Sequence, residues 1–399
     1  MVLAIFVFTN LFILLSGKTY LYNGILKTYL VGKTGPGIYD LDVFPTNTIE
    51  KSNERFSWRV FAAQPSLSQE NENFHQMMKT KAFLVIKDDN IVYEKYWENH
   101  SIETVSNSFS MAKTIVSLLL GIALEEGKIK SIDEKVSNYL PSFHRNSRNE
   151  ISIRHLLTMS GGFDWEESGI NPLSETAEAY YGTNLKRLVT TQRVVENPGK
   201  VFHYQSGNTQ LLSMIIEKAT GMTISKYAES KLWKKIGAES NAYWSLDDEG
   251  GDEKAFCCFY ATARDFAKLG RLVLNKGIWK GEQVVSEKYI TEMSSPAMEL
   301  ITEDGLTNLV YGYQIWIYNQ NNNPVLYFRG LLGQYIFILP NENTIIVRLG
   351  EKIEPNFKPH RFVIFPEKIN KYDHLVGHST DILKYLEMKD EIVKQITVK

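Results

Sequence analysis

Cysteine is scarce in this chain, whose 399 residues include two, the neighbours Cys257 and Cys258. Neighbouring cysteines rarely form a disulfide because the bridge needs a constrained geometry, so we interpret both as small buried residues. The scarcity excludes a disulfide-rich secreted scaffold, and it leaves the cellular compartment open.

An excess of either charge is also lacking. The 44 Lys and Arg and 46 Asp and Glu residues give a formal net charge of -2. Such a balance creates no global field that attracts nucleic acid, which is therefore not an expected partner. A content of 43% hydrophobic residues is ordinary for a globular protein with a sizeable core, and the length suits one large domain or two modest ones.

Several catalytic signatures are absent. The chain contains no Gly-x-Ser-x-Gly, no His-Glu-x-x-His and no glycine-rich phosphate loop with a lysine. These absences argue against a nucleophile-elbow hydrolase, a zinc protease of that type and a P-loop nucleotide hydrolase. Internal repeats and low-complexity tracts are missing as well.

An apolar run of transmembrane length is lacking too. Residues 2–15 are apolar apart from Thr9 and Asn10, which makes about 14 residues where a span needs roughly 20. This length suits a signal-peptide core or a marginal, uncleaved membrane anchor. No Lys or Arg precedes the run and Lys18 follows it, which weakly opposes export. We nevertheless predict an exported protein, periplasmic or at the cell surface, with membrane association through its N-terminus; the alternative is a buried N-terminal helix.

Strand patterns lie near both ends of the chain, with a helical region between them. A hairpin is predicted from 82–86 and 91–97, and further strands from 311–318, 325–328, 335–339 and 344–349. Helical pattern dominates from 111 to 293, and 379–394 predicts a closing helix. The economical arrangement is an antiparallel sheet built from both ends, packed by helices, beside a helical lobe. A ligand cleft is expected between sheet and lobe.

The predicted organisation is therefore an α+β fold in three segments. Residues 1–17 form the signal peptide or anchor, 18–57 an N-terminal arm or linker, and 58–399 the main domain. The helical lobe, about 125–300, is inserted between the sheet-forming ends. Residues 352–377 match no pattern, and we assign them no role beyond a loop over the site or a partner surface.

Ser110-Met111-Ala112-Lys113 is the one Ser-x-x-Lys in the sequence, and it opens a predicted helix. Positions i and i+3 share a helix face, so the Lys113 ammonium nitrogen can reach the Ser110 hydroxyl. A serine needs a base to become nucleophilic, and a lysine whose pKa is lowered by burial can be that base. The alternative is an ordinary buried helix with a serine cap.

Two further segments fit the same chemistry. Tyr204-Gln205-Ser206 precedes an apolar helix, and a tyrosine facing a Ser/Lys pair can move a proton; we expect Lys113 to lower its pKa. Phe328-Arg329-Gly330-Leu331 carries a glycine of the kind that marks close approach of another backbone. A backbone N–H near Leu331, facing that of Ser110, would complete an oxyanion hole. The alternatives are a tyrosine that only packs and a β-bulge.

These three segments, in this order, resemble the serine hydrolases of the class C β-lactamase and penicillin-binding protein type. The resemblance covers roughly residues 75 to 350. It includes the connecting segments 131–136, 155–162, 261–267 and 311–314. It implies a β-lactamase/transpeptidase-like fold, an acyl-enzyme on Ser110, and Lys113 with Tyr204 as the pair that handles protons. It implies no metal or organic cofactor.

Two departures from the β-lactamase pattern indicate which members of this family the chain resembles most. Phe328 stands where β-lactamases carry a substrate-gripping cation, although Arg329 beside it offers one, and Ser206 replaces the usual Asn. Both changes resemble the esterases of this fold and the 6-aminohexanoate-dimer hydrolases. In the latter a loop tyrosine touches the scissile amide, and Tyr180 or Tyr181 occupies a comparable place.

The predicted function is cleavage of an ester or small amide. Ser206, Tyr181, Arg329 and Gly330 are expected at the substrate, together with Leu331. The segment 164–166 is expected either to line the cleft or to form a capping turn, and His155 and His203 to be structural. The alternatives are a penicillin-binding D-Ala-D-Ala carboxypeptidase or β-lactamase, and a non-catalytic sensor on the same fold. The sequence leaves the oligomeric state open.

Overall fold

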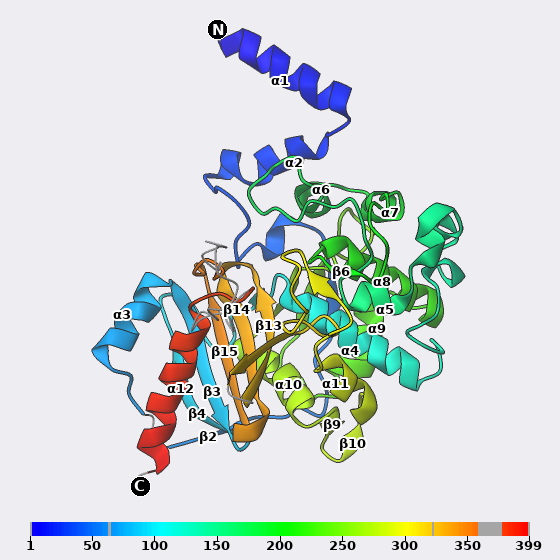
Figure 1. The fold of residues 1–399 in the computed structure, drawn as a ribbon. Helices are drawn as coiled ribbons and strands as arrows, with labels where there is room; N and C mark the ends of the chain where they lie inside the picture. The colour runs from blue at the N-terminus through cyan, green and yellow to red at the C-terminus, as the bar shows by residue number, and fades with distance from the viewer. Residues whose placement is uncertain (1, 63–64, 321–322, 358–376, 398–399) are drawn as a thin grey trace, which may run out of the picture.

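The computed structural model describes residues 2–62, 65–320, 323–357 and 377–397. Its centre is a seven-stranded sheet in the order β12-β13-β14-β15-β3-β4-β2. The strands are β2 (Arg59–Val60), β3 (Thr80–Lys87), β4 (Asn90–Tyr96), β12 (Trp316–Gln320), β13 (Asn323–Gly330), β14 (Gln334–Leu339) and β15 (Thr344–Gly350). All neighbours are antiparallel except β2, which runs parallel to β4. As predicted, the sheet joins segments from both ends of the chain, where β15 pairs with β3 (Figure 1).

The first hairpin, β3 to β4, turns on two residues. Asp88 and Asp89 both have positive φ, 48° and 61°, and Lys87 pairs with Asn90 across the turn. Two-residue hairpin turns favour positive φ at both residues, because the twist of such a turn matches the twist of the two strands that it joins. The predicted hairpin is confirmed, with β3 longer than the predicted 82–86 and β4 shifted by one residue from the predicted 91–97.

Helices cover both faces of this sheet. Along β3 the side chains alternate, so Phe83 and Val85 join one hydrophobic core while Leu84 and Ile86 join the other. The first core is closed by α12 (Ile382–Thr397), the predicted closing helix, and by α3 (Gln69–Met77). The second is closed by α4 (Met111–Glu125) and α10 (Ala263–Leu274). A strand buried on both faces explains why residues 82–86 are a continuous apolar run.

The remaining helices form the lobe beside the sheet and the N-terminal region. They are α1 (Val2–Ser16), α2 (Tyr20–Lys27), α5 (Ile153–Leu157), α6 (Glu175–Tyr181), α7 (Leu185–Thr190), α8 (Ser206–Thr220), α9 (Ile224–Ala228) and α11 (Glu287–Met293). Short 3-10 turns connect several of them. The expected helical lobe between the sheet-forming ends is present.

The lobe also contains strands that the sequence pattern did not indicate. A four-stranded sheet has the order β1-β7-β8-β5. Its strands are β1 (Thr46–Ile49), β5 (Ser106–Asn107), β7 (Ala242–Ser245) and β8 (Phe259–Ala261). Two-stranded ribbons pair β6 (Val201–Phe202) with β11 (Ile301–Thr302), and β9 (Ile278–Trp279) with β10 (Glu282–Gln283). These strands have two to four residues, too few for an alternating pattern to stand out.

One predicted strand, 311–318, is wrong in its first half, because β12 begins at Trp316. The preceding residues form a turn in which Gln314 has a φ of 59°. The side-chain amide of Gln314 donates to the carbonyls of Leu156 and Leu157, at 2.9 and 3.1 Å. These bonds hold the turn against the end of α5, so the residues before Trp316 do not adopt the extended conformation of a strand.

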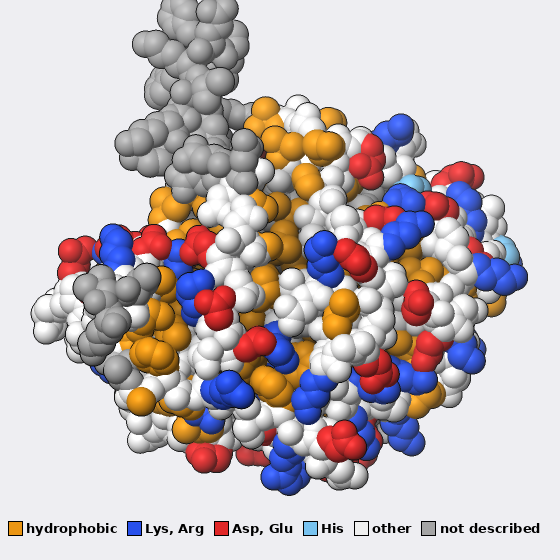
Figure 2. All heavy atoms as spheres, turned by 90° about the horizontal axis from the view of Figure 1, so that it is seen from below, with side chains coloured by type: hydrophobic (Ala, Val, Ile, Leu, Met, Phe, Trp, Pro, Cys, Tyr) orange, Lys and Arg blue, Asp and Glu red, His pale blue; other side chains and the backbone are white. Residues whose placement is uncertain are grey.

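The N-terminal helix α1 projects from the body of the protein, at the blue end of the ribbon in Figure 1. Large apolar side chains on it are exposed, among them Phe8 at 73% and Leu15 at 78%. In the part of the chain that the structure describes, no helix combines the length and the apolar character needed to cross a membrane. On the face shown in Figure 2, side chains of both charges are interspersed.

Candidate active site

Ser110 lies at the N-terminus of α4, where a tight backbone presents it. Phe109 directly before it has a φ of 45°, a conformation that costs a non-glycine residue energy and concentrates at functional sites. Its N–H donates to Asn107 Oδ1 at 2.9 Å, and the N–H of Ser108 donates to the Phe259 carbonyl of β8 at 2.8 Å. The helix that follows is buried from Met111 to Ala123. Ser110 is therefore held on a rigid support while remaining half-exposed.

Lys113 lies one turn further, fully buried beneath Ser110. Its Nζ donates to Ser110 Oγ at 2.8 Å and to the Phe256 carbonyl at 2.9 Å. Burial lowers the pKa of Lys113 to about 8, and the negative charge of Glu167 partly opposes this. A lysine with such a pKa is partly neutral near physiological pH, which is what a general base requires.

Tyr204 completes a three-residue cluster. Lys113 Nζ lies 5.0 Å from the centroid of its ring, and the Tyr204 hydroxyl is in hydrogen-bonding reach of Ser110. Its ring packs against Trp316, with centroids 5.4 Å apart. Burial and the charge of Glu167 raise the pKa of Tyr204 well above its usual value. The expectation that Lys113 lowers this pKa is wrong, because desolvation and Glu167 raise the pKa by more than Ser110 and Arg329 lower it. Tyr204 therefore stays a protonated phenol at neutral pH.

The end of β13 brings Gly330 and Leu331 to the cluster. A β-carbon on Gly330 would lie 2.2 Å from the carbonyl oxygen of Ser108, so this glycine permits the close backbone approach that its position predicts. The turn after it contains Leu332 with a φ of 61°. The buried Arg348 holds that turn by donating to the carbonyls of Leu332 and Gly333, at 2.9 and 2.7 Å. Sequence reasoning did not find this supporting arginine.

Arg329 also reaches the cluster, from the same strand. Its guanidinium lies over the Trp316 ring, 5.1 Å from the centroid. It donates to the Gly377 carbonyl at 3.1 Å and to Asn356 Oδ1. Arg329 is therefore present at the site as the cation that the sequence predicted beside Phe328. Protein groups already use part of its hydrogen-bonding capacity.

The cluster opens onto a pocket of about 730 Å³. Ser110, Tyr204, Ser206, Arg329, Gly330 and Leu331 line it, as do Tyr180 and Tyr181. The N-terminal segment supplies another wall, with Tyr20, Leu21, Gly24, Ile25, Thr28, Tyr29, Thr34, Gly35 and Pro36. Among residues 352–377, positions 353–356 line the pocket, while 358–376 lie outside the described residues. A volume of this size suits a drug-sized ligand.

The loop before α6 contributes a carboxylate that sequence reasoning missed by one position. Glu167 lines the pocket and accepts hydrogen bonds from the Ser206 hydroxyl at 2.6 Å and the Ser206 N–H at 2.7 Å. Of the segment 164–166, Asp164 pairs with Arg193, and Glu166 accepts from Asn171 at 2.8 Å. The side chains of Asp164 and Glu166 thus hold the loop in place. The residue of this loop that reaches the cluster is Glu167, which follows them.

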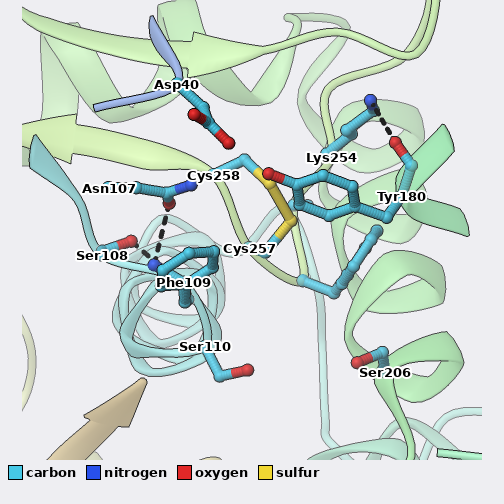
Figure 3. Close-up of a disulfide and its surroundings, with 12 residues drawn as sticks. Asp40, Asn107, Ser108, Phe109, Ser110, Tyr180, Ser206, Lys254, Cys257 and Cys258 are labelled. Atoms are coloured by element: carbon cyan, nitrogen blue, oxygen red, sulfur yellow. Dashed lines mark hydrogen bonds between the residues drawn. A yellow bond between two sulfur atoms is a disulfide. The ribbon is translucent and has the colours of Figure 1, made fainter. Parts of the chain in front are cut away.

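Cys257 and Cys258 correct the expectation of two unlinked residues, because their sulfur atoms are bonded to each other. Cys258 has a φ of 64°, so the turn is one that allows adjacent cysteines to meet. In Figure 3 the disulfide lies between the start of α4, with Ser110, and the two segments that carry Tyr180 and Lys254. Cys257 lines the pocket, and its neighbour Phe256 supplies the carbonyl that Lys113 contacts.

Neither histidine singled out in the sequence lines the pocket. His155 accepts the Ser152 N–H in a capping box at the start of α5, and His203 contacts the carboxylates of Glu196 and Glu303. Within the described ranges, no three His, Cys, Asp or Glu side chains are grouped so that they could hold a metal ion.

Comparison with known proteins places these features in a family. The Beta-lactamase family profile matches residues 71–360. A 6-aminohexanoate-dimer hydrolase from Paenarthrobacter ureafaciens is 26% identical over 296 residues, which cover 69% of this chain and 74% of that protein. A solved structure entitled "Putative 6-aminohexanoate-dimer hydrolase from Bacillus anthracis" superposes with a TM-score of 0.72 at 21% identity, covering 89% of this chain and 92% of the other.

A family VIII carboxylesterase structure is similar over 80% of this chain and 95% of its own length, with a TM-score of 0.60 at 16% identity. At such identities the structural matches establish the fold alone. The family match spans most of the chain and includes the Ser110–Lys113 cluster and the end of β13. The chain therefore belongs to the Beta-lactamase family and has its β-lactamase/transpeptidase-like fold.

Proposed function

We propose that this protein is a serine hydrolase that cleaves an ester or a small amide through an acyl-enzyme on Ser110. The observation that carries the proposal is the contact of 2.8 Å between Lys113 Nζ and Ser110 Oγ, made by a fully buried lysine whose pKa is lowered to about 8. A buried lysine without a carboxylate partner is costly, and such costs are typical of sites where proton transfer is needed.

In the acylation step, neutral Lys113 takes the Ser110 proton as Oγ forms a bond to the substrate carbonyl carbon. The negative charge on the carbonyl oxygen is stabilised by the backbone N–H groups of Ser110 and Leu331, a contribution of about 2.7–4 kcal/mol per donor in such sites. Tyr204, a protonated phenol, then gives its proton to the departing oxygen or nitrogen as the bond to it breaks. The Lys113 ammonium restores the Tyr204 proton.

Deacylation runs the same groups in reverse. Lys113, neutral again, removes a proton from water as the water oxygen bonds to the acyl carbon, and Ser110 leaves with a proton returned through Tyr204. Both ester and amide are included because the family relatives comprise a 6-aminohexanoate-dimer hydrolase and a carboxylesterase. No step of this scheme calls for a metal or an organic cofactor.

Penicillin-binding and β-lactamase activity is the second candidate. Arg329 lines the pocket and offers a cation for a substrate carboxylate. Its contacts with Asn356 and Gly377 favour an ester or amide without that carboxylate, because a carboxylate would have to share them.

The test is intact-mass measurement after incubation with a fluorophosphonate probe, beside Ser110→Ala and Lys113→Ala. We expect one adduct on the wild-type protein and none on either variant, with circular dichroism confirming that both variants fold. Absence of an adduct on the folded wild-type protein would contradict the proposal and favour a sensor on this fold. Labelling by penicillin in place of ester turnover would favour the second candidate.

We also propose that α1 associates with a membrane surface. Its exposed apolar side chains, such as Phe8 and Leu15, belong to the stretch 2–15, which carries no charge and has Thr9 and Asn10 as its polar residues, and Lys18 follows after Ser16 and Gly17. An uncharged apolar helix gains free energy by leaving water, and a lysine at its end favours anionic headgroups. Export remains a prediction from the sequence.

A further inference from the structure

The pocket wall formed by the N-terminal segment is a feature that the proposed chemistry does not use. Residues 20–36 precede the family match, which begins at 71. They nonetheless border the same cavity as Ser110. A segment outside the matched region that closes the active-site pocket is placed to determine which substrates enter.

Hydrogen bonds at its N-terminal end fix the segment to the lobe. The Lys18 ammonium donates to the Leu173 carbonyl at 2.9 Å, and the Tyr20 hydroxyl donates to the Pro172 carbonyl at 3.0 Å. Further along α2, the Asn23 amide donates to the Tyr181 carbonyl at 3.1 Å. The bonds reach the segment 172–181, of which Pro172, Tyr180 and Tyr181 are among the residues that line the same pocket.

Packing adds to these bonds. Gly24 stands against the Tyr181 ring, where a β-carbon would make an ordinary contact at 3.6 Å. The ammonium of Lys27 lies 4.6 Å from the centroid of the Phe44 ring, and that ring packs edge-on against Tyr180 at 5.3 Å. The segment is thus a built part of the pocket and does not merely lie over its opening.

The chemistry of the wall is apolar. Leu21 and Ile25 stand one helical turn apart on α2, and both line the pocket. Facing parts of the lining include Phe109, Tyr181, Phe256 and Leu331. Of the described lining residues, Glu167, Arg329 and Glu354 carry charge. All three already bind protein groups, Ser206, Asn356 and Thr380 respectively.

We propose that residues 20–36 form a binding subsite for an extended apolar group of the substrate, so that the enzyme prefers esters or amides bearing a medium-length or long alkyl chain over acetyl derivatives. The identity of the bond that is cleaved rests on the proposed function. The subsite itself rests on the pocket and its apolar wall. Each methylene transferred from water to such a wall raises kcat/KM up to about fourfold, since burial of a methylene is worth about 0.8 kcal/mol.

The experiment compares two matched double variants of the full chain. Leu21→Ser/Ile25→Ser changes the pocket face of the segment. Leu26→Ser/Leu30→Ser changes two apolar residues at the same spacing that are exposed at 56% and 69% and do not line the pocket. The readout is kcat/KM for p-nitrophenyl acetate, butyrate, octanoate and dodecanoate.

We expect the wild-type protein and Leu26→Ser/Leu30→Ser to favour the octanoate over the acetate by at least about tenfold. Leu21→Ser/Ile25→Ser should lose most of this preference, because its kcat/KM should fall much more on the octanoate than on the acetate. Equal profiles for the two double variants, or a wild-type preference for the acetate, would overturn the proposal.

A binding measurement separates this proposal from the chemistry at Ser110. Titration calorimetry of octanamide into the Ser110→Ala protein, with and without Leu21→Ser/Ile25→Ser, requires no turnover. Binding that the double variant weakens about tenfold or more supports the subsite even if no ester is hydrolysed. Failure of octanamide to bind, or binding that the double variant leaves unchanged, contradicts the subsite even if Ser110 proves to be an active nucleophile.

Discussion

The carbonyl oxygen of Ser108 occupies the space that a β-carbon at Gly330 would need, since the two would lie 2.2 Å apart. Gly330→Ala should therefore push β13 away from the segment before Ser110. We expect a loss of about 1–3 kcal/mol in unfolding free energy. We also expect kcat/KM to fall about 10- to 100-fold, as the Leu331 N–H moves from its position. Gly169→Ala is the control, because nothing lies within 4 Å of its added carbon; equal effects of the two variants would contradict this account.

The pKa of Lys113 predicts how activity depends on pH. Neutral Lys113 is the proposed base, and burial lowers its pKa to about 8, so about one tenth of the molecules carry the base at pH 7. The expected kcat/KM rises with pH through about 8 and levels off above it, as protons leave Lys113. A profile measured from pH 5.5 to 10 on a neutral ester checks this. A profile flat over this range would exclude Lys113 as the titrating base.

The charge of Glu167 should influence the midpoint pH of the kcat/KM profile. Its negative charge raises the pKa of Lys113 and so opposes the effect of burial. Glu167→Gln removes the charge, and the midpoint of the profile should move to lower pH. Glu166→Gln removes a neighbouring charge whose carboxylate binds Asn171, and it should leave the midpoint in place. A shift to higher pH in Glu167→Gln would disprove the electrostatic coupling.

The bond between Cys257 and Cys258 predicts a labelling pattern. Protein purified without reductant and then denatured should take up no carbamidomethyl group from iodoacetamide. After reduction it should take up two, which intact mass resolves. Because Phe256 supplies a carbonyl to Lys113 directly before this pair, reduction should also lower activity. Two adducts before reduction would show that the cysteines are unlinked.

The proposed membrane association predicts sedimentation with lipid vesicles. The full chain should bind vesicles of phosphatidylcholine with phosphatidylglycerol, and Phe8→Asp/Leu15→Asp should weaken binding because charge opposes insertion of α1. Leu306→Asp/Leu309→Asp adds the same charge at exposed apolar residues elsewhere and serves as the control. If both double variants sediment like the wild type, α1 is not the site of association.

The sequence by itself determined those features that depend on local periodicity. The Ser110–Lys113 contact follows from the i, i+3 geometry of a helix, and the hairpin of β3 and β4 follows from two apolar segments around a polar turn. The sheet built from both ends was predictable for the same reason, because its long strands carry clear patterns. Gly330 was recognisable because a glycine in a strand indicates a close approach of backbone.

Only the tertiary structure decided the features that depend on residues far apart in sequence. It brought Glu167 to Ser206, joined residues 20–36 to the pocket of Ser110, and supported the turn after Leu331 with the buried Arg348. It also reversed the expected pKa shift of Tyr204, since desolvation is a sum over all surrounding groups and no single neighbour in the sequence reveals it. Contacts between residues close in sequence can therefore be predicted from the sequence, whereas burial and the walls of a pocket exist only once the chain has folded.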